Sequence, residues 1–308
     1  MTVLVVGAGA VGSLFGARFA AAGHRVLLVG RPAHVEAIRA RGVEVTGRDA
    51  GTFRCEAATE IPRGTHADLA LLTVKAFDVA AAADAVARAL APTPLLIPQN
   101  GLGSETVAHR SLEQGGWPAG SIRLVRAVHS VPATLTAPGV VRAAGTGEVV
   151  LPTADPAAGD ADPAARFATL FRSSGFSVRA VPSIEREVWK KVVVNAAINP
   201  VTAVHRVPNG RLAQEPWRTE ALSLLLEARS VAEAAGVVLS EAEVRGDLDR
   251  VVRETAENRS SMLQDLERGH RTEIEAISGE IVRRAAAHGI EVPATRTVLA
   301  KVRAAQPS

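Results

Sequence analysis

The stretch that decides the fold is residues 2–12, which read TVLVVGAGAVG. A run of aliphatic and β-branched residues, typical of a buried strand, is followed by Gly7, Gly9 and Gly12 in the spacing G-x-G-x-x-G. A helical pattern then continues to about Ala22, and HRVLLVG at 24–30 has the pattern of a second strand. A strand, a glycine-rich turn, a helix and a second strand in this order predict the dinucleotide-binding βαβ unit of a parallel sheet.

Each glycine has a separate role in such a unit. Gly7 makes the tight turn, Gly9 lets the backbone approach a pyrophosphate, and Gly12 lets the helix pack closely on the strand. The free amides at the start of the helix, at Ala10 and Val11, would bind the pyrophosphate with help from the helix dipole. The alternative is a glycine-rich turn that binds no ligand, and the βαβ context disfavours it.

The end of the second predicted strand indicates which dinucleotide binds. An NAD site usually carries Asp or Glu about 20 residues after the glycines, whereas an Arg accommodates the 2′-phosphate of NADP. Here no acid stands at the strand end, and Arg31 lies 19 positions after Gly12. We therefore predict NADPH as the cofactor. The alternative is that Arg31 is an ordinary surface arginine, because this chain is rich in arginine.

The rest of the chain predicts two domains of different class. Strands are expected near 43–46, 52–57, 68–74 and 94–98, a helix at 77–90, antiparallel strands beyond residue 121, a helix at 164–173 and a strand at 176–181. From residue 183 onward the pattern is helical, with a first helix at about 184–199. The predicted fold class is α/β, with a Rossmann-type NADP-binding domain at 1–183 and an all-helical substrate and catalytic domain at 184–308.

Composition excludes several other classes of protein. The 308 residues are 47% hydrophobic and 22% charged, as in ordinary globular proteins. No run reaches the ~18 apolar residues of a membrane helix, and the start lacks the basic region of a signal peptide. The single Cys55 excludes an internal disulfide, and the net charge of +3 with 3% aromatic residues gives no basic nucleic-acid surface. We expect a cytoplasmic protein without a metal, membrane or nucleic-acid partner, and a homodimer stays open.

Rare residue types mark candidate functional positions. Only four of the 35 basic residues are lysine, and only five asparagines occur. Arginine can replace lysine as a surface charge, but it cannot give up a proton at accessible pH. Lys75 and Asn100 follow two predicted parallel strands, at the edge where such sheets bind ligands. The alternatives are an exposed cap for Lys75 and an ordinary Asn-Gly turn for Asn100.

A polar stripe runs along the first helix of the second domain. Lys191, Asn195 and Asn199 are spaced i, i+4 and i+8 within an otherwise apolar stretch, so they share one face. Such a stripe is costly to bury unless a polar group faces it. A ligand cleft or a satisfied polar contact between domains would each provide one. Glu273, taken alone, has the pattern of a first-turn helix acid.

Together these motifs resemble a known family. GAGAVGS, TVKAFD, PQNGLG, WKKVVVNAAINPVTA and SSMLQDLERGHRTEIEAISG are similar to the ketopantoate reductases (2-dehydropantoate 2-reductases), in the same order along nearly the whole chain. The resemblance implies NADPH-dependent reduction of 2-dehydropantoate, a small 2-keto acid, to (R)-pantoate in pantothenate and coenzyme A biosynthesis. It leaves open a family member that reduces another 2-keto acid. A protein that senses NADP without catalysis is a further alternative.

The resemblance also implies roles for individual residues. Lys191 matches the catalytic lysine that donates the proton, and Glu273 matches the glutamate that contacts the substrate hydroxyl. The matching substrate-contacting positions are Asn100, Asn195, Asn199 and Ser261. Lys75 and Asn100 are expected near the cofactor, with Gly7, Gly9, Ala10, Val11, Gly12 and Arg31. The doublets Lys190–Lys191 and Ser260–Ser261 leave a shift of one residue open.

Overall fold

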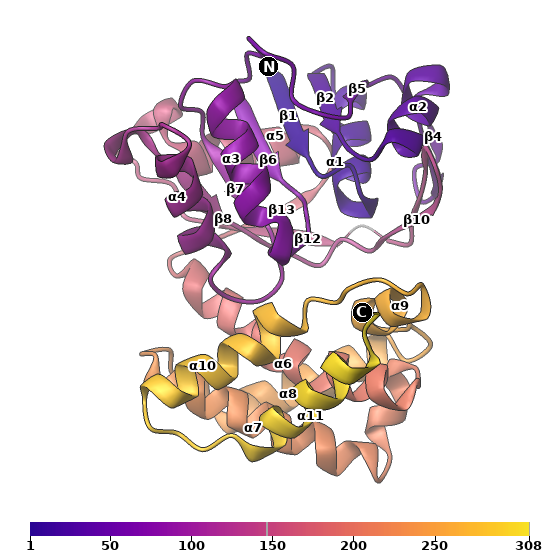
Figure 1. The fold of residues 1–308 in the computed structure, drawn as a ribbon, viewed down its shortest axis with the longest axis vertical. Coiled ribbons are helices and arrows are strands. Elements are labelled where there is room, and N and C mark those ends of the chain that lie inside the picture. The colour runs from indigo at the N-terminus through magenta and orange to yellow at the C-terminus, as the bar shows by residue number, and fades with distance from the viewer. Residues whose placement is uncertain (146, 308) are drawn as a thin grey trace. The chain divides into compact units, whose positions relative to one another are not determined.

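The protein consists of two structural units, which are visible in the computed structural model (Figure 1). The structure describes residues 1–145 and 147–307. The first unit comprises residues 1–99 and 104–184, and the second comprises Asn100–Gly103 together with the chain from Glu185 onward. The segment Asn100–Gly103 therefore groups with the second unit, although the residues on both sides of it belong to the first. The roles predicted for the two domains stay predictions.

The first unit is built on a six-stranded parallel sheet. Its strand order is β5-β2-β1-β6-β7-β8, and every neighbouring pair runs parallel. The strands are β1 Thr2–Val6, β2 Arg25–Val29, β5 Glu56–Ala58, β6 Leu69–Leu72, β7 Leu95–Ile97 and β8 Leu124–Arg126. The α/β class predicted from the sequence is confirmed.

Helices cover both faces of this sheet. Side chains alternate between the faces along a strand, so Val3 and Val5 of β1 pack in one apolar cluster, while Leu4 and Val6 pack in another. The helices are α1 Ala10–Ala21, α2 Pro32–Arg41, α3 Val79–Ala89, α4 Ser104–Gln114 and α5 Pro163–Ser173, with short 3-10 turns η1 Ala76–Asp78, η2 Ala119–Ser121 and η3 Gly159–Ala161. Helices α3 and α4 lie side by side on one face of the sheet (Figure 1). Phe15 of α1 belongs to the cluster on the other face.

The prediction of a single strand at 52–57 is wrong, because two short strands occupy this stretch. β4 Gly51–Phe53 pairs antiparallel with β3 Val43–Gly47, in a second sheet of order β10-β11-β3-β4. β5 instead joins the parallel sheet beside β2. The two residues between them are Arg54 and Cys55, so no glycine or proline marks the change of sheet.

The antiparallel strands expected beyond residue 121 are only partly present. β10 Ala133–Ala137 and β11 Val140–Ala143 do form an antiparallel hairpin, and β9 Val128–His129 pairs antiparallel with β12 Glu148–Pro152. However, β8 pairs parallel with β7, β11 pairs parallel with β3, and β12 pairs parallel with β13 Ser177–Val181. The reason is that α4 connects β7 to β8 as a crossover helix, which makes the two strands parallel.

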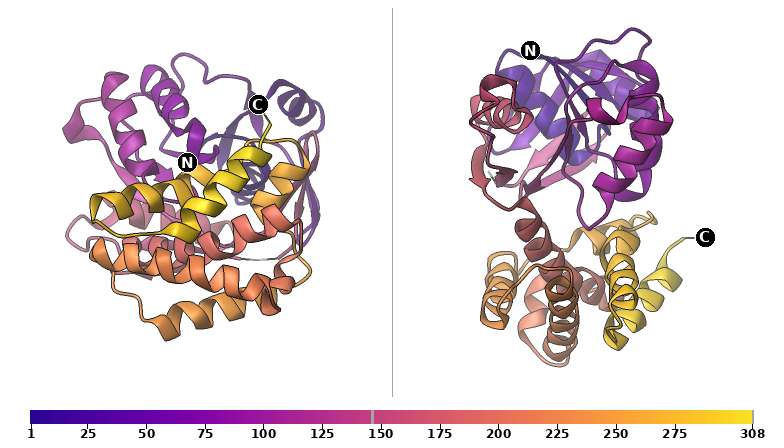
Figure 2. Two further views of the ribbon diagram at one scale, coloured as in Figure 1. Left: turned by 60° about the horizontal axis from the view of Figure 1, so that its bottom comes forward. Right: turned by 90° about the vertical axis from the view of Figure 1, so that its left-hand side faces the viewer.

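From α6 onward, the described part of the chain contains helices joined by turns and loops and no strand, as predicted. These elements are α6 Ile184–His205, the 3-10 turn η4 Asn209–Ala213, α7 Trp217–Ala234, α8 Glu241–Glu254, α9 Ser261–Glu267, the π-helical turn η5 Glu275–Gly279, α10 Glu280–Ala287 and α11 Pro293–Ala305. Helix α7 contacts α8, α10 and α11, and Figure 2 shows this bundle from two further directions. Among the described helices, none has the length and apolar character needed to cross a lipid bilayer.

Helix α6 is longer than predicted. It was expected to end near residue 199, before Pro200, but it continues to His205 with Pro200 inside it. A proline inside a helix removes one hydrogen bond and costs about 3 kcal/mol. Burial of the apolar residues around this turn offsets that cost, since Val201 and its neighbours are shielded from solvent.

Candidate active site

The predicted cofactor turn directly follows β1. Gly7 has φ +107°, in the left-handed region that favours glycine. A Cβ atom at Gly7 would lie 2.5 Å from the Val74 amide nitrogen, so the close approach of these backbones also requires glycine. The amides of Gly7 and Ala8 donate to the Val29 carbonyl at 2.9 and 2.8 Å, and the Thr73 hydroxyl donates to the Gly7 carbonyl at 2.9 Å. The turn is therefore held by β2 and by the end of β6.

Glycine is required at position 12 by packing within the protein, whereas packing does not require it at position 9. A Cβ at Gly12 would overlap the Gly7 carbonyl oxygen and the Thr73 hydroxyl, so internal packing excludes any side chain there. Gly9 has φ −89°, which any residue can adopt, and a Cβ there would meet only the Gly7 carbonyl oxygen at 4.0 Å. The protein's own packing thus leaves room at Gly9, as expected where a ligand approaches the backbone.

The start of α1 offers hydrogen-bond donors beside this opening. The helix begins at Ala10, its N-cap residue is Gly9, and its first turn contains no acidic side chain. The first amides of a helix, here including Ala10 and Val11, have no acceptor within the helix. Amides of this kind, together with the positive end of the helix dipole, are suited to a phosphate group. The turn therefore fits the pyrophosphate of a dinucleotide.

Arg31 lies at the other side of the glycine turn. It is the exposed N-cap residue of α2, directly after β2. A Cβ at the preceding Gly30 would lie 2.8 Å from the Ala8 Cβ, so this strand end runs close against the turn. The residue that directly follows β2 is thus an arginine and not an acid, and binding of a ribose 2′-phosphate by Arg31 stays a prediction.

A buried histidine links the starts of α1 and α2. The Gly139 amide donates to Nδ1 of His34 at 2.9 Å, so that nitrogen carries no proton. Nε2, which lies 2.8 Å from the Ser13 hydroxyl oxygen, therefore carries the proton of the neutral ring. Burial lowers the pKa of His34, and the nearby Arg31 charge lowers it further. A neutral His34 holds the first turns of both helices together.

Lys75 lies at the same edge of the sheet as the glycine turn. It follows β6 as the half-buried N-cap residue of η1. β6 pairs with β1 in parallel register, with Val6 opposite Leu72, so both strands end side by side. Lys75 and Gly7 thus follow the ends of neighbouring strands, and the position of Lys75 near the cofactor stays a prediction.

Asn100 and Glu273 are brought together within the second unit. They are 173 positions apart, yet the Asn100 side-chain amide donates to Oε2 of Glu273 at 3.2 Å. Glu273 is only 8% exposed. The Oδ1 atom of Asn100 is also buried, and within the described part of the chain it accepts no hydrogen bond. A carboxylate held by an amide, with a further acceptor beside it, is suited to binding a hydroxyl group.

The lysine doublet on α6 separates into two environments. Lys190 pairs with Oε1 of Glu243 at 3.2 Å and with Oδ2 of Asp247 at 3.5 Å, both on α8. Burial raises the pKa of Glu243, but hydrogen bonds from Arg186 and Lys190 outweigh this and lower the pKa below its usual value. Lys190 is thus part of an ion-pair network between helices. Lys191 points about 100° away from it around the helix.

The predicted polar stripe is present on α6. Lys191 and Asn195 are half-buried and Asn199 is buried, at 6% exposed. Their i, i+4, i+8 spacing lies entirely within the helix, so the three side chains follow one face. The adjacent Val192 and Val193 are buried in the apolar interior. The stripe remains the candidate for substrate binding and proton donation.

The serine doublet also separates into two environments. Ser260 is buried, accepts the Leu263 amide at 3.1 Å and accepts the Thr202 hydroxyl at 2.7 Å. It is the N-cap of α9 and joins that helix to α6. Ser261 is exposed at the first position of α9. Ser261 is therefore the better placed of the two to contact a ligand.

Comparisons with known proteins identify the family of this chain. The family described as "Ketopantoate reductase PanE/ApbA" matches residues 3–156, and the family described as "Ketopantoate reductase PanE/ApbA C terminal" matches residues 183–306. The chain belongs to the ketopantoate reductase family. The resemblance inferred from the sequence motifs is thus confirmed.

Individual relatives are similar to this chain over nearly its whole length. A protein named 2-dehydropantoate 2-reductase from Halobacterium salinarum is 38% identical over 310 residues, covering 99% of both chains. A protein of the same name from Archaeoglobus fulgidus is 36% identical and covers 98% of this chain and 96% of its own length. The crystal structure of a PanE/ApbA family ketopantoate reductase from Ralstonia eutropha JMP134 is similar with a TM-score of 0.87 and 34% identity, covering 99% of this chain and 98% of its own.

Two supporting residues were missed by sequence reasoning. Thr73 holds the Gly7 carbonyl, as described above. The Gln99 side-chain amide donates to the carbonyls of Leu72 and Val74, so it ties the chain after β7 to the end of β6. Both act on backbone atoms distant in sequence, so neither follows a local pattern. The only signal for Gln99 is its position in the PQNG motif beside Asn100.

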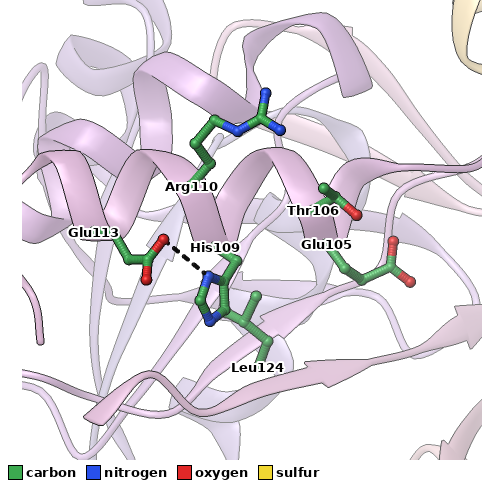
Figure 3. Close-up of a pocket in the computed structure, with 6 residues that line it drawn as sticks. All are labelled: Glu105, Thr106, His109, Arg110, Glu113 and Leu124. Atoms are coloured by element: carbon green, nitrogen blue, oxygen red, sulfur yellow. Dashed lines mark ion pairs between the residues drawn. The ribbon is translucent and has the colours of Figure 1, made fainter. Parts of the chain in front are cut away.

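A shallow surface pocket lies on α4, apart from the residues predicted above (Figure 3). Nδ1 of His109 and Oε2 of Glu113 form an ion pair at 3.5 Å along the helix. The lining residues are Glu105, Thr106, His109, Arg110, Glu113 and Leu124. None of the predicted site residues lines it, and we assign no role to it. Within the described residues, no group of three or more His, Cys, Asp or Glu side chains could hold a metal ion.

Proposed function

We propose that this chain catalyses the NADPH-dependent reduction of 2-dehydropantoate to (R)-pantoate, a step towards pantothenate and coenzyme A. The relatives named 2-dehydropantoate 2-reductase support this, because two of them match at 36–38% identity over nearly the whole chain. The structural observation that carries the proposal is the buried carboxylate of Glu273, which receives a hydrogen bond from Asn100. A protein that only senses a nucleotide has no need of such a pair.

Lys191 is the proposed proton donor. When bound, NADPH supplies the hydride that adds to the keto carbon, and the oxygen on that carbon then needs a proton. The Lys191 ammonium group would stabilise the developing negative charge and supply that proton. Lys190 has a different position, since it pairs with Glu243 and Asp247 on α8. An arginine could not replace Lys191, since guanidinium retains its proton.

Glu273 has two proposed tasks. Its carboxylate would accept a hydrogen bond from a substrate hydroxyl, and its negative charge would favour the protonated form of Lys191. The Asn100 amide fixes one carboxylate oxygen by donating to it. The other substrate contacts are proposed for Asn195, Asn199 and Ser261, whose neutral groups would bind substrate oxygens without adding charge.

The cofactor contacts are proposed for the first unit and Asn100. The turn at Gly7, Gly9 and Gly12, with the amides at Ala10 and Val11, would hold the pyrophosphate, since Gly9 leaves room for it. Arg31 would bind the 2′-phosphate, and Lys75 and Asn100 are proposed as further cofactor contacts. Cytoplasmic location and a homodimer stay predictions.

One set of rate measurements tests this function. The purified chain should oxidise NADPH with 2-dehydropantoate far faster than with pyruvate, and NADH should be a poorer cofactor. Arg31→Ala should remove most of the preference for NADPH, because the 2′-phosphate loses its partner. Faster turnover of another 2-keto acid would favour the alternative substrate. NADPH binding without turnover of any 2-keto acid would favour a sensor.

A further inference from the structure

The helix that follows Glu273 begins with an unusual turn. Residues Glu275–Gly279 form a π-helix that continues into the α-helix α10. In a regular α-helix, the Glu280 amide would donate to the Ala276 carbonyl, four residues back. Here it donates to the carbonyls of Glu275 and Ile277 instead. The π-turn therefore releases the Ala276 carbonyl from its regular bond with Glu280.

The released carbonyl binds a segment from far away in the sequence. The Leu102 amide donates to the Ala276 carbonyl at 2.9 Å. The neighbouring Gly101 lies directly against the same peptide group, because a Cβ atom at Gly101 would overlap the Ala276 oxygen and lie 2.7 Å from its carbonyl carbon. Gly101 also has φ +84°, which favours glycine. The two backbones therefore touch without an intervening side chain.

The same turn holds Glu273. The amides of Ala276 and Ile277 donate to the Glu273 carbonyl at 3.1 and 3.2 Å. The Glu273 carboxylate receives the side chain of Asn100, which directly precedes Gly101. Both members of the pair are thus attached to one short piece of backbone. A π-turn inside a helix is rare and frequently occurs at a functional site.

We propose that the π-turn Glu275–Gly279 and the segment Asn100–Leu102 form a backbone clamp that orients Asn100 against the Glu273 carboxylate. Gly101 is a positioning residue in this clamp, because it permits the approach that lets Leu102 reach the Ala276 carbonyl. This inference rests on the proposed function and extends it, since it identifies what holds the carboxylate at the reacting centre.

The chain offers a matched control for Gly101. Gly103 has nearly the same backbone conformation, with φ +83°, so alanine is equally strained at both positions. A Cβ at Gly103, however, would meet first the Oε1 atom of Glu280 at 2.8 Å, which is a side-chain atom and not part of the backbone. Alanine at Gly101 would instead meet a backbone carbonyl. Only Gly101→Ala should separate the two segments.

The test combines turnover with hydrogen exchange. For Gly101→Ala we expect kcat with the preferred 2-keto acid to fall at least tenfold and KM for NADPH to change less than threefold. For Gly103→Ala, kcat should fall less than threefold. Tm should fall further in Gly101→Ala than in Gly103→Ala, because only Gly101→Ala disturbs the bond between the Leu102 amide and the Ala276 carbonyl. An equal fall of kcat in both, or an unchanged kcat in Gly101→Ala, overturns the role of Gly101.

Hydrogen exchange of the Leu102 amide in the parent chain tests whether the clamp is formed. This test depends neither on activity nor on the folding of a variant. A bonded Leu102 amide should exchange at least 100-fold more slowly than the same amide in an unstructured peptide, and exchange at the unstructured rate overturns the clamp. If the parent reduces no 2-keto acid, the proposed function fails, while slow Leu102 exchange would still support the clamp itself.

Discussion

Substituting Gly9 by alanine separates a requirement of the ligand from a requirement of the fold. The new methyl group would meet only the Gly7 carbonyl oxygen, at 4.0 Å, and φ −89° at Gly9 is accessible to alanine. Alanine is a poorer N-cap than glycine, at a cost of about 0.5–1 kcal/mol. Unfolding should therefore occur about 1–4 °C lower than in the parent chain, since each kcal/mol shifts Tm by about 2–4 °C in domains of this size.

The effect on NADPH should be much larger than the effect on stability. The methyl group would occupy the space through which the backbone approaches the pyrophosphate. Forcing extra volume into a close-packed contact costs about 1–3 kcal/mol. The Kd for NADPH should therefore rise about 5- to 150-fold in Gly9→Ala. Titration with NADPH, followed by calorimetry, measures this change directly.

Gly12→Ala is the matched control. Its methyl group would overlap the Gly7 carbonyl oxygen and the Thr73 hydroxyl, so the fold itself must shift. Its Tm should fall well below that of Gly9→Ala when both are measured in the absence of NADPH. Parental affinity for NADPH in Gly9→Ala would refute the argument that Gly9 is kept for the cofactor. So would an equal loss of Tm in both variants, because packing would then explain both glycines.

Three further predictions concern side chains. Lys191→Ala should lower kcat at least ~100-fold, and Lys191→Arg should not restore it. Lys190→Ala should mainly lower Tm, because it removes ion pairs to α8. If steady-state kinetics instead show the larger loss of kcat in Lys190→Ala, the polar stripe is shifted by one residue. Burial, and then the Arg31 charge, lower the pKa of His34 below 6.5. The neutral ring should therefore stabilise the fold above about pH 6.5, and this stabilisation should be lost as the pH falls below that value. The difference in Tm between the parent and His34→Gln should shrink on acidification, and a growing difference would contradict this. Burial raises the pKa of Cys55 to about 12, so its thiol should react with a disulfide reagent at mildly alkaline pH only after denaturation, and fast reaction of the folded chain would show that it is accessible.

The sequence predicted those parts of the fold that depend on local patterns. The strand, glycine turn and helix at 2–21 carry their period and their turn residues within a few positions, and the structure has them as β1 and α1. The stretch 52–57 failed because the partner of a strand is a non-local property. An uninterrupted pattern there covers two strands that belong to different sheets. The direction of β8 likewise depends on where α4 returns the chain to the sheet.

The length of α6 shows a different limit of local patterns. Pro200 predicts a helix end, because proline lacks an amide hydrogen and clashes with the preceding turn. The helix continues through it, since the residues on both sides are buried. Tertiary burial therefore outweighs the local cost of the proline, and no pattern within the helix reveals that burial.

Residue scarcity identified candidate positions, but only contact partners separated neighbouring residues. Lysine is rare in this chain, yet scarcity cannot distinguish Lys190 from Lys191. The structure gives Lys190 a part in joining α6 to α8 through its ion pairs, and the role of Lys191 stays a prediction. Ser260 is distinguished from Ser261 in the same way, because its hydroxyl caps α9.

For Glu273, the local sequence pattern has a sufficient explanation of its own and therefore does not reveal the contact with Asn100. An acid after Thr272 is explained by a helix start alone, and the Ile274 amide does lie 3.3 Å from the Thr272 hydroxyl. What distinguishes Glu273 is its partner Asn100, which arrives from a loop 173 positions away. That loop is held by a carbonyl that is released only because the following turn is π-helical. The contact between Asn100 and Glu273 therefore depends on which backbone hydrogen bonds form in the folded chain, and residue types and spacing do not reveal these.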